Sequence, residues 1–154
     1  MASPFIIGLV LFAIVGSKVA YDSYSWQKKT DAFQAALQKP FKEDHYGGKT
    51  PEETWAMFLE ARKKKDLDLA TKYFFFYDRD KKKADFLKGI ELGRYDKATK
   101  FFVDGPLIKD VEVSDNITAY YHIPNPLPAE HIVEAYSIVF RFNEYTKIWK
   151  IVSI

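Results

Sequence analysis

The stretch TPEETWAMFLEA, residues 50–61, opens the main folded region of the chain and has the form of a helix start. Thr50 is a good N-cap, and Pro51 fits the first helical position, where its missing N–H costs no hydrogen bond. Glu53 stands three residues after Thr50 and completes a capping box. We expect a helix that runs to about residue 65, with an apolar stripe formed by Trp55, Phe58 and Leu59.

Three more helical segments are predicted downstream. Asp66 caps a second helix, on which the run Tyr73–Tyr77 would place aromatic side chains on every face. A third helix is predicted over residues 80–92 and a short fourth over residues 95–102. The residues expected on the apolar sides of the second and third helices are Leu69, Ala70, Tyr73, Phe74, Tyr77, Ala84, Leu87, and Ile90 or Leu92.

Beyond residue 106 the apolar residues alternate with a period of two, which is typical of strands. Helices followed by antiparallel strands favour an α+β fold. We expect three to four helices packed on one face of a curved antiparallel sheet of about four strands. The predicted strands cover residues 108–113, 117–123, 132–142 and 148–154.

Two parts of this region resemble the nuclear-transport-factor-2-like superfamily. They are residues 50–61 with KDLDLATKYF at 65–74, and the ending from Phe140 to Ile151 around Trp149. The resemblance covers about residues 50–154 and is closest to small membrane-tethered bacterial members. It implies a curved sheet wrapped on helices, a conical cavity and a Trp packed inside the cone. It implies no reaction, because that fold hosts enzymes, binding modules and structural parts alike.

The N-terminal segment is apolar enough to suggest a membrane anchor. Residues 5–17 carry no charge, and Lys18 is the one charged side chain among the first twenty residues. That length is close to the roughly 20 residues that a spanning helix needs. The residues predicted to contact the bilayer are Phe5, Ile6, Ile7, Leu9, Val10, Leu11, Phe12, Ile14 and Val15.

Two other interpretations of this segment are weaker. A cleaved signal peptide needs basic residues before the apolar run, and residues 1–4 contain none. Lys18 would also occupy the −3 position if cleavage followed Ala20. A helix buried in a soluble protein is the other interpretation, because the strictly apolar stretch is short. However, residues 5–15 are apolar on every face, whereas a surface helix of a soluble protein shows a polar side.

The residues after the apolar run predict an interface and a spacer. Lys18 can extend to the membrane surface, and Tyr21, Tyr24 and Trp26 stand where an interfacial aromatic belt would lie. Basic residues follow the run and none precedes it, so the positive-inside rule favours the inner side for the C-terminal domain. The predicted domains are an anchor and spacer helix that Pro40 stops (1–39), a linker (40–49) and a cone-shaped α+β head (50–154).

Composition limits the classes of function. The chain has 154 residues, of which 47% are hydrophobic and 29% charged, and it has no Cys. These fractions exclude a disordered chain, and the lack of Cys excludes disulfide scaffolds and thiol catalysis. Residues 1–40 carry a net charge of +2, which leaves 19 basic and 19 acidic residues in the remainder. A nucleic-acid partner is disfavoured, because such proteins concentrate a basic excess on the binding domain.

No constellation in the sequence is typical of catalysis. Enzymes of the superfamily that the chain resembles place Asp, His or Tyr in the cone to move protons. His122 and His131 flank the segment around residues 124–128, but no carboxylate clearly orients either of them. The histidine spacing matches no zinc site, so we expect no metal, no cofactor and no catalytic residue.

The run Tyr73–Tyr77 is the clearest candidate for a contact surface. A core can absorb about three of its five side chains, and the others would line a cavity or a partner surface. The candidate partner or cavity residues are Tyr73, Phe75, Phe76, Tyr77, His122 and His131.

The leading hypothesis is a single-pass membrane-anchored, non-catalytic structural or interaction subunit of a larger membrane-associated assembly. Its partners would be the lipid bilayer and other membrane-protein subunits or copies of itself. One alternative is a filament subunit resembling a type IV pilin, although Phe5 stands where most such pilins carry Glu. The other alternative is a membrane-tethered small-ligand binder, or an isomerase-like or dehydratase-like enzyme, that uses the cone cavity.

Overall fold

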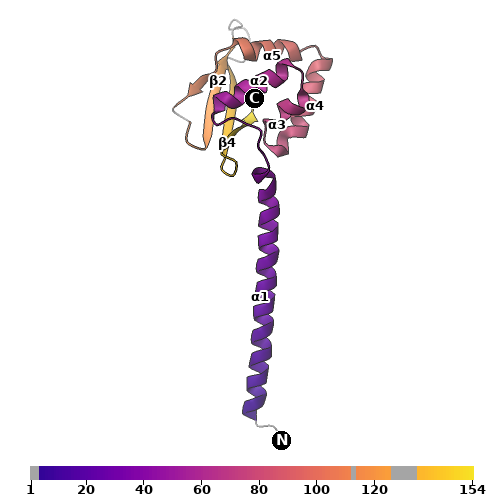
Figure 1. Ribbon diagram of the computed structural model, residues 1–154, viewed down its shortest axis with the longest axis vertical. Helices are drawn as coiled ribbons and strands as arrows, with labels where there is room; N and C mark the ends of the chain where they lie inside the picture. Colours follow the sequence, from indigo (N-terminus) through magenta and orange to yellow (C-terminus); the bar gives the residue numbers. More distant parts are fainter. Residues whose placement is uncertain (1–3, 112–113, 126–134) are drawn as a thin grey trace. The chain divides into compact units, whose positions relative to one another are not determined.

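A computed structural model describes residues 4–111, 114–125 and 135–154, without the side chains of residues 4–17, 19 and 20 (Figure 1). The chain divides into two compact units, Met1–Pro40 and Phe41–Ile154. We describe each unit by itself and refer to the second as the head.

The first unit consists of most of the helix α1, Pro4–Lys42. With 39 residues, this helix is about 58 Å long at the standard rise per residue. Among the described residues, no helix combines the length and the apolarity that a membrane crossing requires. The predicted bilayer-contacting side chains of residues 5–15 lie outside the described residues, so the anchor stays a prediction.

The prediction that Pro40 stops this helix is wrong, because α1 continues through Pro40 to Lys42. Proline removes one backbone donor from a helix, and packing can compensate for that loss. Here the ring of Phe41 lies 5.1 Å from that of Phe76 and 6.0 Å from that of Phe75. Asn143 also donates a 2.8 Å hydrogen bond to the Phe41 carbonyl. These contacts within the head hold the last turn in place.

The head contains a four-stranded antiparallel sheet in the order β1-β2-β3-β4, so neighbouring strands are also consecutive along the chain. In its register Ala119 lies opposite Phe140, and Tyr121 lies opposite Ile138. All four of these side chains are buried. The strands are β1 Ile108–Asp110, β2 Thr118–Pro124, β3 Ala135–Asn143 and β4 Ile148–Ser153.

Four α-helices and a short 3₁₀-helix of the described residues accompany this sheet, which confirms the α+β class. In Figure 1 the strands stand on the left of the head and α3 and α4 on the right. The helices are α2 Pro51–Lys63, α3 Leu67–Lys72, η1 (the 3₁₀-helix) Phe76–Asp78, α4 Arg79–Glu91 and α5 Tyr95–Asp104.

The predicted start of α2 is confirmed. Thr50 Oγ1 accepts the backbone N–H of Glu53 at 3.1 Å, and Pro51 occupies the first helical position. The Glu53 carboxylate reaches back to the N–H of Lys49 at 2.7 Å, one residue before the usual partner in a capping box. Both ends of this reciprocal cap fix where the helix begins.

The aromatic run Tyr73–Tyr77 does not form the predicted helix. Instead α3 ends at Lys72, and Phe74 forms a parallel β-bridge with Ile151. The Ile151 N–H donates to the Tyr73 carbonyl at 2.9 Å. Strand β4 is at one end of the sheet, so its outer backbone groups need partners that this extended segment supplies.

Helix α4 buries a different face from the predicted one. Phe86 is the buried residue, whereas Leu87, Ile90 and Leu92 are exposed. The ring of Phe86 lies 5.9–6.2 Å from those of Phe58, Phe74 and Tyr95. The large ring of Phe86 packs into this aromatic core and so sets the rotation of α4 about its axis. The face with the smaller aliphatic side chains is left exposed.

The core lies between the helices and the sheet and is dominated by aromatic rings. Phe58 of α2 is at its centre, with ring centroids of Trp55 and Phe74 at 5.2 and 5.6 Å. The other buried residues of this core are Ala61, Ala70, Tyr73, Phe86, Tyr95, Phe102, Ala119, Tyr121, Ile123, Ile138, Phe140 and Ile151.

We predict that Phe58→Ala lowers the free energy of unfolding by about 3–5 kcal/mol, because it removes a large buried ring and leaves a cavity. The neighbouring Met57 is 42% exposed, and Met57→Ala should cost below about 1 kcal/mol. Urea unfolding followed by circular dichroism measures both values. Equal effects of the two substitutions would contradict this core assignment.

Candidate functional site

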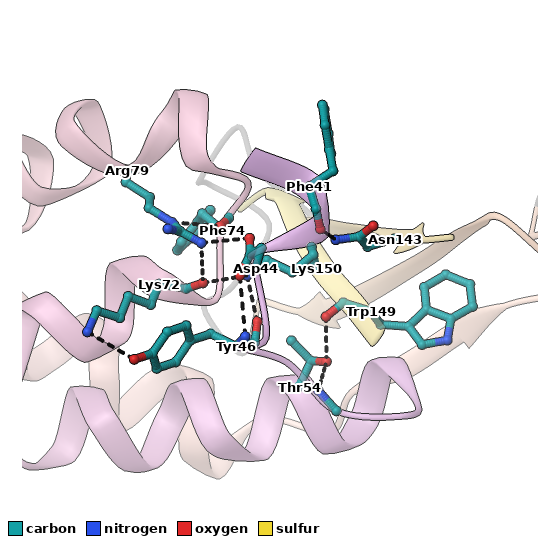
Figure 2. Close-up of polar contacts among 11 residues, drawn as sticks. Phe41, Asp44, Tyr46, Thr54, Lys72, Phe74, Arg79, Asn143, Trp149 and Lys150 are labelled. Atoms are coloured by element: carbon teal, nitrogen blue, oxygen red, sulfur yellow. Dashed lines mark hydrogen bonds and ion pairs between the residues drawn. The ribbon is translucent and has the colours of Figure 1, made fainter. Parts of the chain in front are cut away.

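A buried cluster of charged side chains joins three segments of the head (Figure 2). Lys150 of β4 and Asp44 form an ion pair with Nζ and Oδ1 3.0 Å apart, and their side chains are 0% and 2% exposed. Arg79, at the start of α4, reaches the other oxygen of Asp44 at 2.7 Å. One carboxylate therefore accepts from two cations that lie far apart in the sequence.

The ammonium group of Lys150 has a partner for each of its protons. Besides Asp44 it donates to the carbonyl of Tyr46 at 2.5 Å and to the carbonyl of Lys72. Burial lowers the pKa of Lys150 from 10.5 to about 8, while Asp44 raises it and the charge of Arg79 lowers it. A lysine with a lowered pKa can serve as a nucleophile. This one has no exposed surface and all its protons engaged, so we interpret it as structural.

Arg79 completes the cluster through backbone carbonyls. Its guanidinium donates to Lys72 at 3.1 Å through Nη2 and to Phe74 at 3.2 Å through Nε. These carbonyls belong to the segment where α3 ends and the chain turns to pair with β4. Figure 2 shows the guanidinium of Arg79 and the carboxylate of Asp44 facing each other beside the Lys72 carbonyl.

The segment predicted as a linker, residues 40–49, contributes to this packing. Asp44 and Gly48 are buried. Gly48 donates to Thr54 Oγ1 at 2.8 Å, and its carbonyl accepts from Trp149 at 2.9 Å. A Cβ atom on Gly47 would stand 2.3 Å from the Trp149 carbonyl oxygen. The two glycines therefore allow this segment to approach β4 closely.

A second buried cation, Arg62 of α2, has a different environment. Its side chain is surrounded by four aromatic rings, and the residue is 4% exposed. Thr99 accepts its Nε proton at 3.1 Å. In the part of the chain that the structure describes, no carboxylate pairs with it. Distances from Cζ to the ring centroids are 4.4 Å for Tyr95, 4.9 Å for Phe86, 5.4 Å for Phe102 and 5.5 Å for Phe58.

Within the described residues, cavities lie around α2, α4 and α5, and three of them concern the site. One of about 510 Å³ is lined by Phe101, Pro106 and Pro124 together with Lys97, Lys100 and Asp104. The other two, of about 260 and 220 Å³, both include Arg62 in their walls. Burial lowers the pKa of Arg62 from its usual value, and the Tyr95 phenol opposes that shift. Arginine nevertheless stays protonated in proteins, so its positive charge stands at the edge of both cavities.

The structure separates the candidate contact residues of the aromatic run. Tyr73 and Phe75 are buried, Phe76 is half-buried, and Tyr77 is exposed. The rings of Phe75 and Tyr77 stack in parallel with centroids 5.6 Å apart. Core packing therefore uses part of the run, and Tyr77 presents the largest surface.

The other predicted site residues are dispersed. His122 is half-buried in β2, and His131 lies outside the described residues. Lys18 is exposed, as are Tyr21, Tyr24 and Trp26 along α1. Trp149, which the family resemblance places inside a cone, is half-buried, with its ring 5.5 Å from that of Phe142.

No family model, no curated protein and no solved structure matches this chain. The resemblance to the nuclear-transport-factor-2-like superfamily therefore stays a prediction that rests on the residues quoted for it.

The sequence analysis did not predict the buried charged residues. For two of them, Arg62 and Lys150, the positions of the neighbouring apolar residues could have indicated burial. Arg62 stands four residues after Phe58 and seven after Trp55, so helical spacing places it on the apolar stripe of α2. Lys150 stands between Trp149 and Ile151 in a predicted strand. Asp44 carried no comparable signal, because its partners are 35 and 106 residues away.

We predict that the wild type gains stability relative to Lys150→Met as the pH rises from about 8 to 10.5. In that interval the unfolded chain still binds the Lys150 proton while the folded chain releases it, so the free energy of unfolding increases with pH. Urea titrations of both proteins at several pH values measure this difference. A difference that stays flat or falls over the interval would contradict the burial argument.

Proposed function

We propose that this protein is a single-pass membrane-anchored, non-catalytic interaction subunit of a larger membrane-associated assembly. The anchor is the uncharged run at residues 5–17, and the head stands on the inner side, which the basic residues after that run favour. Its partners are the bilayer and other membrane-protein subunits or copies of itself.

The observation that carries the interaction role is an exposed apolar stripe on α1. Trp26, Phe33 and Leu37 are 73%, 62% and 50% exposed. Their spacing of seven and then four residues places them on one face of a helix. Large apolar side chains gathered on an exposed face mark contact sites, and a helix with such a stripe fits a groove or another helix.

The polar chemistry of the head supports a non-catalytic role. The buried Asp44 and Lys150 and the half-buried Arg79 form hydrogen bonds with one another and with nearby carbonyls, so we interpret their role as structural. The aromatic core holds Phe58, Phe74 and Phe140 with no exposed surface. A small-ligand binder is the second candidate, and the buried cation of Arg62 favours it.

The anchor and the stripe can be tested separately in native membranes. We predict that the full chain stays in the membrane pellet after an alkaline carbonate wash, and that a chain without residues 1–20 is released. Release of the full chain would contradict the anchor.

For the stripe, the double substitution Trp26→Ser and Phe33→Ser should leave the protein in the pellet but remove its stoichiometric partner after mild-detergent purification. The matched control, Gln27→Ser with Gln34→Ser, changes the adjacent helix face at the same spacing and should keep the partner. Mass spectrometry of the purified material measures both. An unchanged partner in the Trp26 and Phe33 variant would contradict the role of the stripe.

A further inference from the structure

In the described part of the chain, the positive charge of Arg62 is buried and no carboxylate forms an ion pair with it. The contrast is with Lys150 and Arg79, which share the carboxylate of Asp44. Among the described residues, Arg62 donates to the hydroxyl of Thr99 and forms no ion pair. Aromatic faces attract a cation but do not neutralise it, and burying an unpaired charge is costly. A group that brings a negative charge to Arg62 would remove that cost.

The terminal nitrogens of Arg62 are accessible to such a group. Thr99 engages Nε, which leaves the edge formed by Nη1 and Nη2 without a hydrogen-bond partner in the described part of the chain. In the described part of the chain, Thr146 Oγ1 is the side-chain nitrogen or oxygen atom that is both fully enclosed and without a hydrogen-bond partner. Nη1 and Nη2 of Arg62 do not belong to that class. Nη1 and Nη2 are therefore not sealed in the core, in agreement with the place of Arg62 in the walls of two cavities.

The smaller cavity, of about 220 Å³, has the walls of a ligand site. Phe86, Phe102, Tyr136 and Ile154 provide apolar surface, and Lys82 and Asp85 are its other charged residues. With Arg62, the charges of these side chains sum to +1. The charges of the cavity of about 260 Å³ also sum to +1, because Lys63 and Lys100 accompany Asp96 and Asp104, but Val103 is the one apolar residue in its wall. The smaller cavity is thus the better place for an anion that carries an apolar body.

The chemistry of the cavity selects the class of anion. A carboxylate is planar and accepts two parallel hydrogen bonds from the edge of a guanidinium. One negative charge matches the single uncompensated cation, whereas a phosphate dianion would face Asp85 with a surplus charge. Pockets for drug-sized ligands measure about 300–1,000 Å³, so this cavity suits a smaller molecule, such as one with a single ring.

We propose that this cavity binds a small monocarboxylate with an apolar body, with its carboxylate on Nη1 and Nη2 of Arg62 and its apolar part against Phe86 and Phe102. The site lies within the head and is independent of the stripe on α1.

Calorimetric titration of the full chain in detergent tests this proposal. The probes are benzoate and 3-phenylpropionate, their neutral amides, and inorganic phosphate, all at constant ionic strength. We expect saturable binding of the two carboxylates and none of the amides. Absence of carboxylate binding to the wild type, or tighter binding of phosphate, would overturn the proposal.

Substitutions then locate the site. Arg62→Met should weaken carboxylate binding at least about tenfold, because it removes the charge-assisted pair and keeps an apolar side chain of similar length. If that variant does not fold, Lys82→Glu tests the same cavity from its rim and should weaken binding several-fold. Its control is Lys81→Glu, which changes a neighbouring exposed residue that does not line the cavity. Equal binding by Lys82→Glu and Lys81→Glu, or unchanged binding by a folded Arg62→Met, would overturn the assignment.

A carboxylate of this chain is the main competitor for the site. Glu130 and Glu134 lie outside the described residues and precede Tyr136 in the sequence. If carboxylates bind to the double variant Glu130→Gln with Glu134→Gln but not to the wild type, the chain supplies its own anion and the proposal is wrong. Equal binding by both proteins supports a site open to an external ligand.

Discussion

Lys150 carries a positive charge into the interior of the head, and the carboxylate of Asp44 makes that position tolerable. The pair joins β4 to the segment that precedes α2, while the carbonyl of Lys72 brings the end of α3 to the same ammonium group. Removing Asp44 would leave the buried charge of Lys150 uncompensated, which is among the more costly changes in a protein core. Removing Lys150 would leave Asp44 paired with Arg79 alone. The close approach at Gly47 and the bridge between Phe74 and Ile151 involve residues within two positions of Tyr46, Lys72 and Lys150 in the sequence.

Arg62 shows that the same fold also holds a buried cation by other means. Around Lys150 the polar groups satisfy every proton, and the result is a closed structural cluster. Around Arg62 the described neighbours are aromatic faces and one hydroxyl, and none of them accepts a hydrogen bond from Nη1 or Nη2. All three protons of Lys150 have acceptors, which fits a structural role. Arg62 has donors without an acceptor among the described residues and lies beside a cavity, so it is the candidate for ligand binding.

Capping residues and hydrophobic periodicity depend on neighbours in the sequence, and they predicted helices and strands of the head. Contacts between distant residues determine where some of these elements end and which faces they bury. The capping residues Thr50 and Glu53 and the alternation after residue 106 depend on neighbours in the chain, so α2 and the strands could be predicted. The aromatic run could not, because its extended form depends on Ile151, far along the sequence. The buried face of α4 likewise depends on rings that three other segments supply around Phe86. Nothing local to Asp44 reveals that it pairs with Lys150.

A double-mutant cycle on Asp44 and Lys150 tests the central claim most directly. The free energies of unfolding of Asp44→Asn, Lys150→Met and the double variant would be compared with the wild type, with the exposed pair Asp68 and Lys83 as a control. The account predicts that Asp44→Asn costs about 3 kcal/mol or more, that Lys150→Met costs less because Arg79 still pairs with Asp44, and that the double variant costs less than the sum. The control cycle should show a much smaller coupling, because solvent screens an exposed pair. Additive losses at Asp44 and Lys150 would contradict the account.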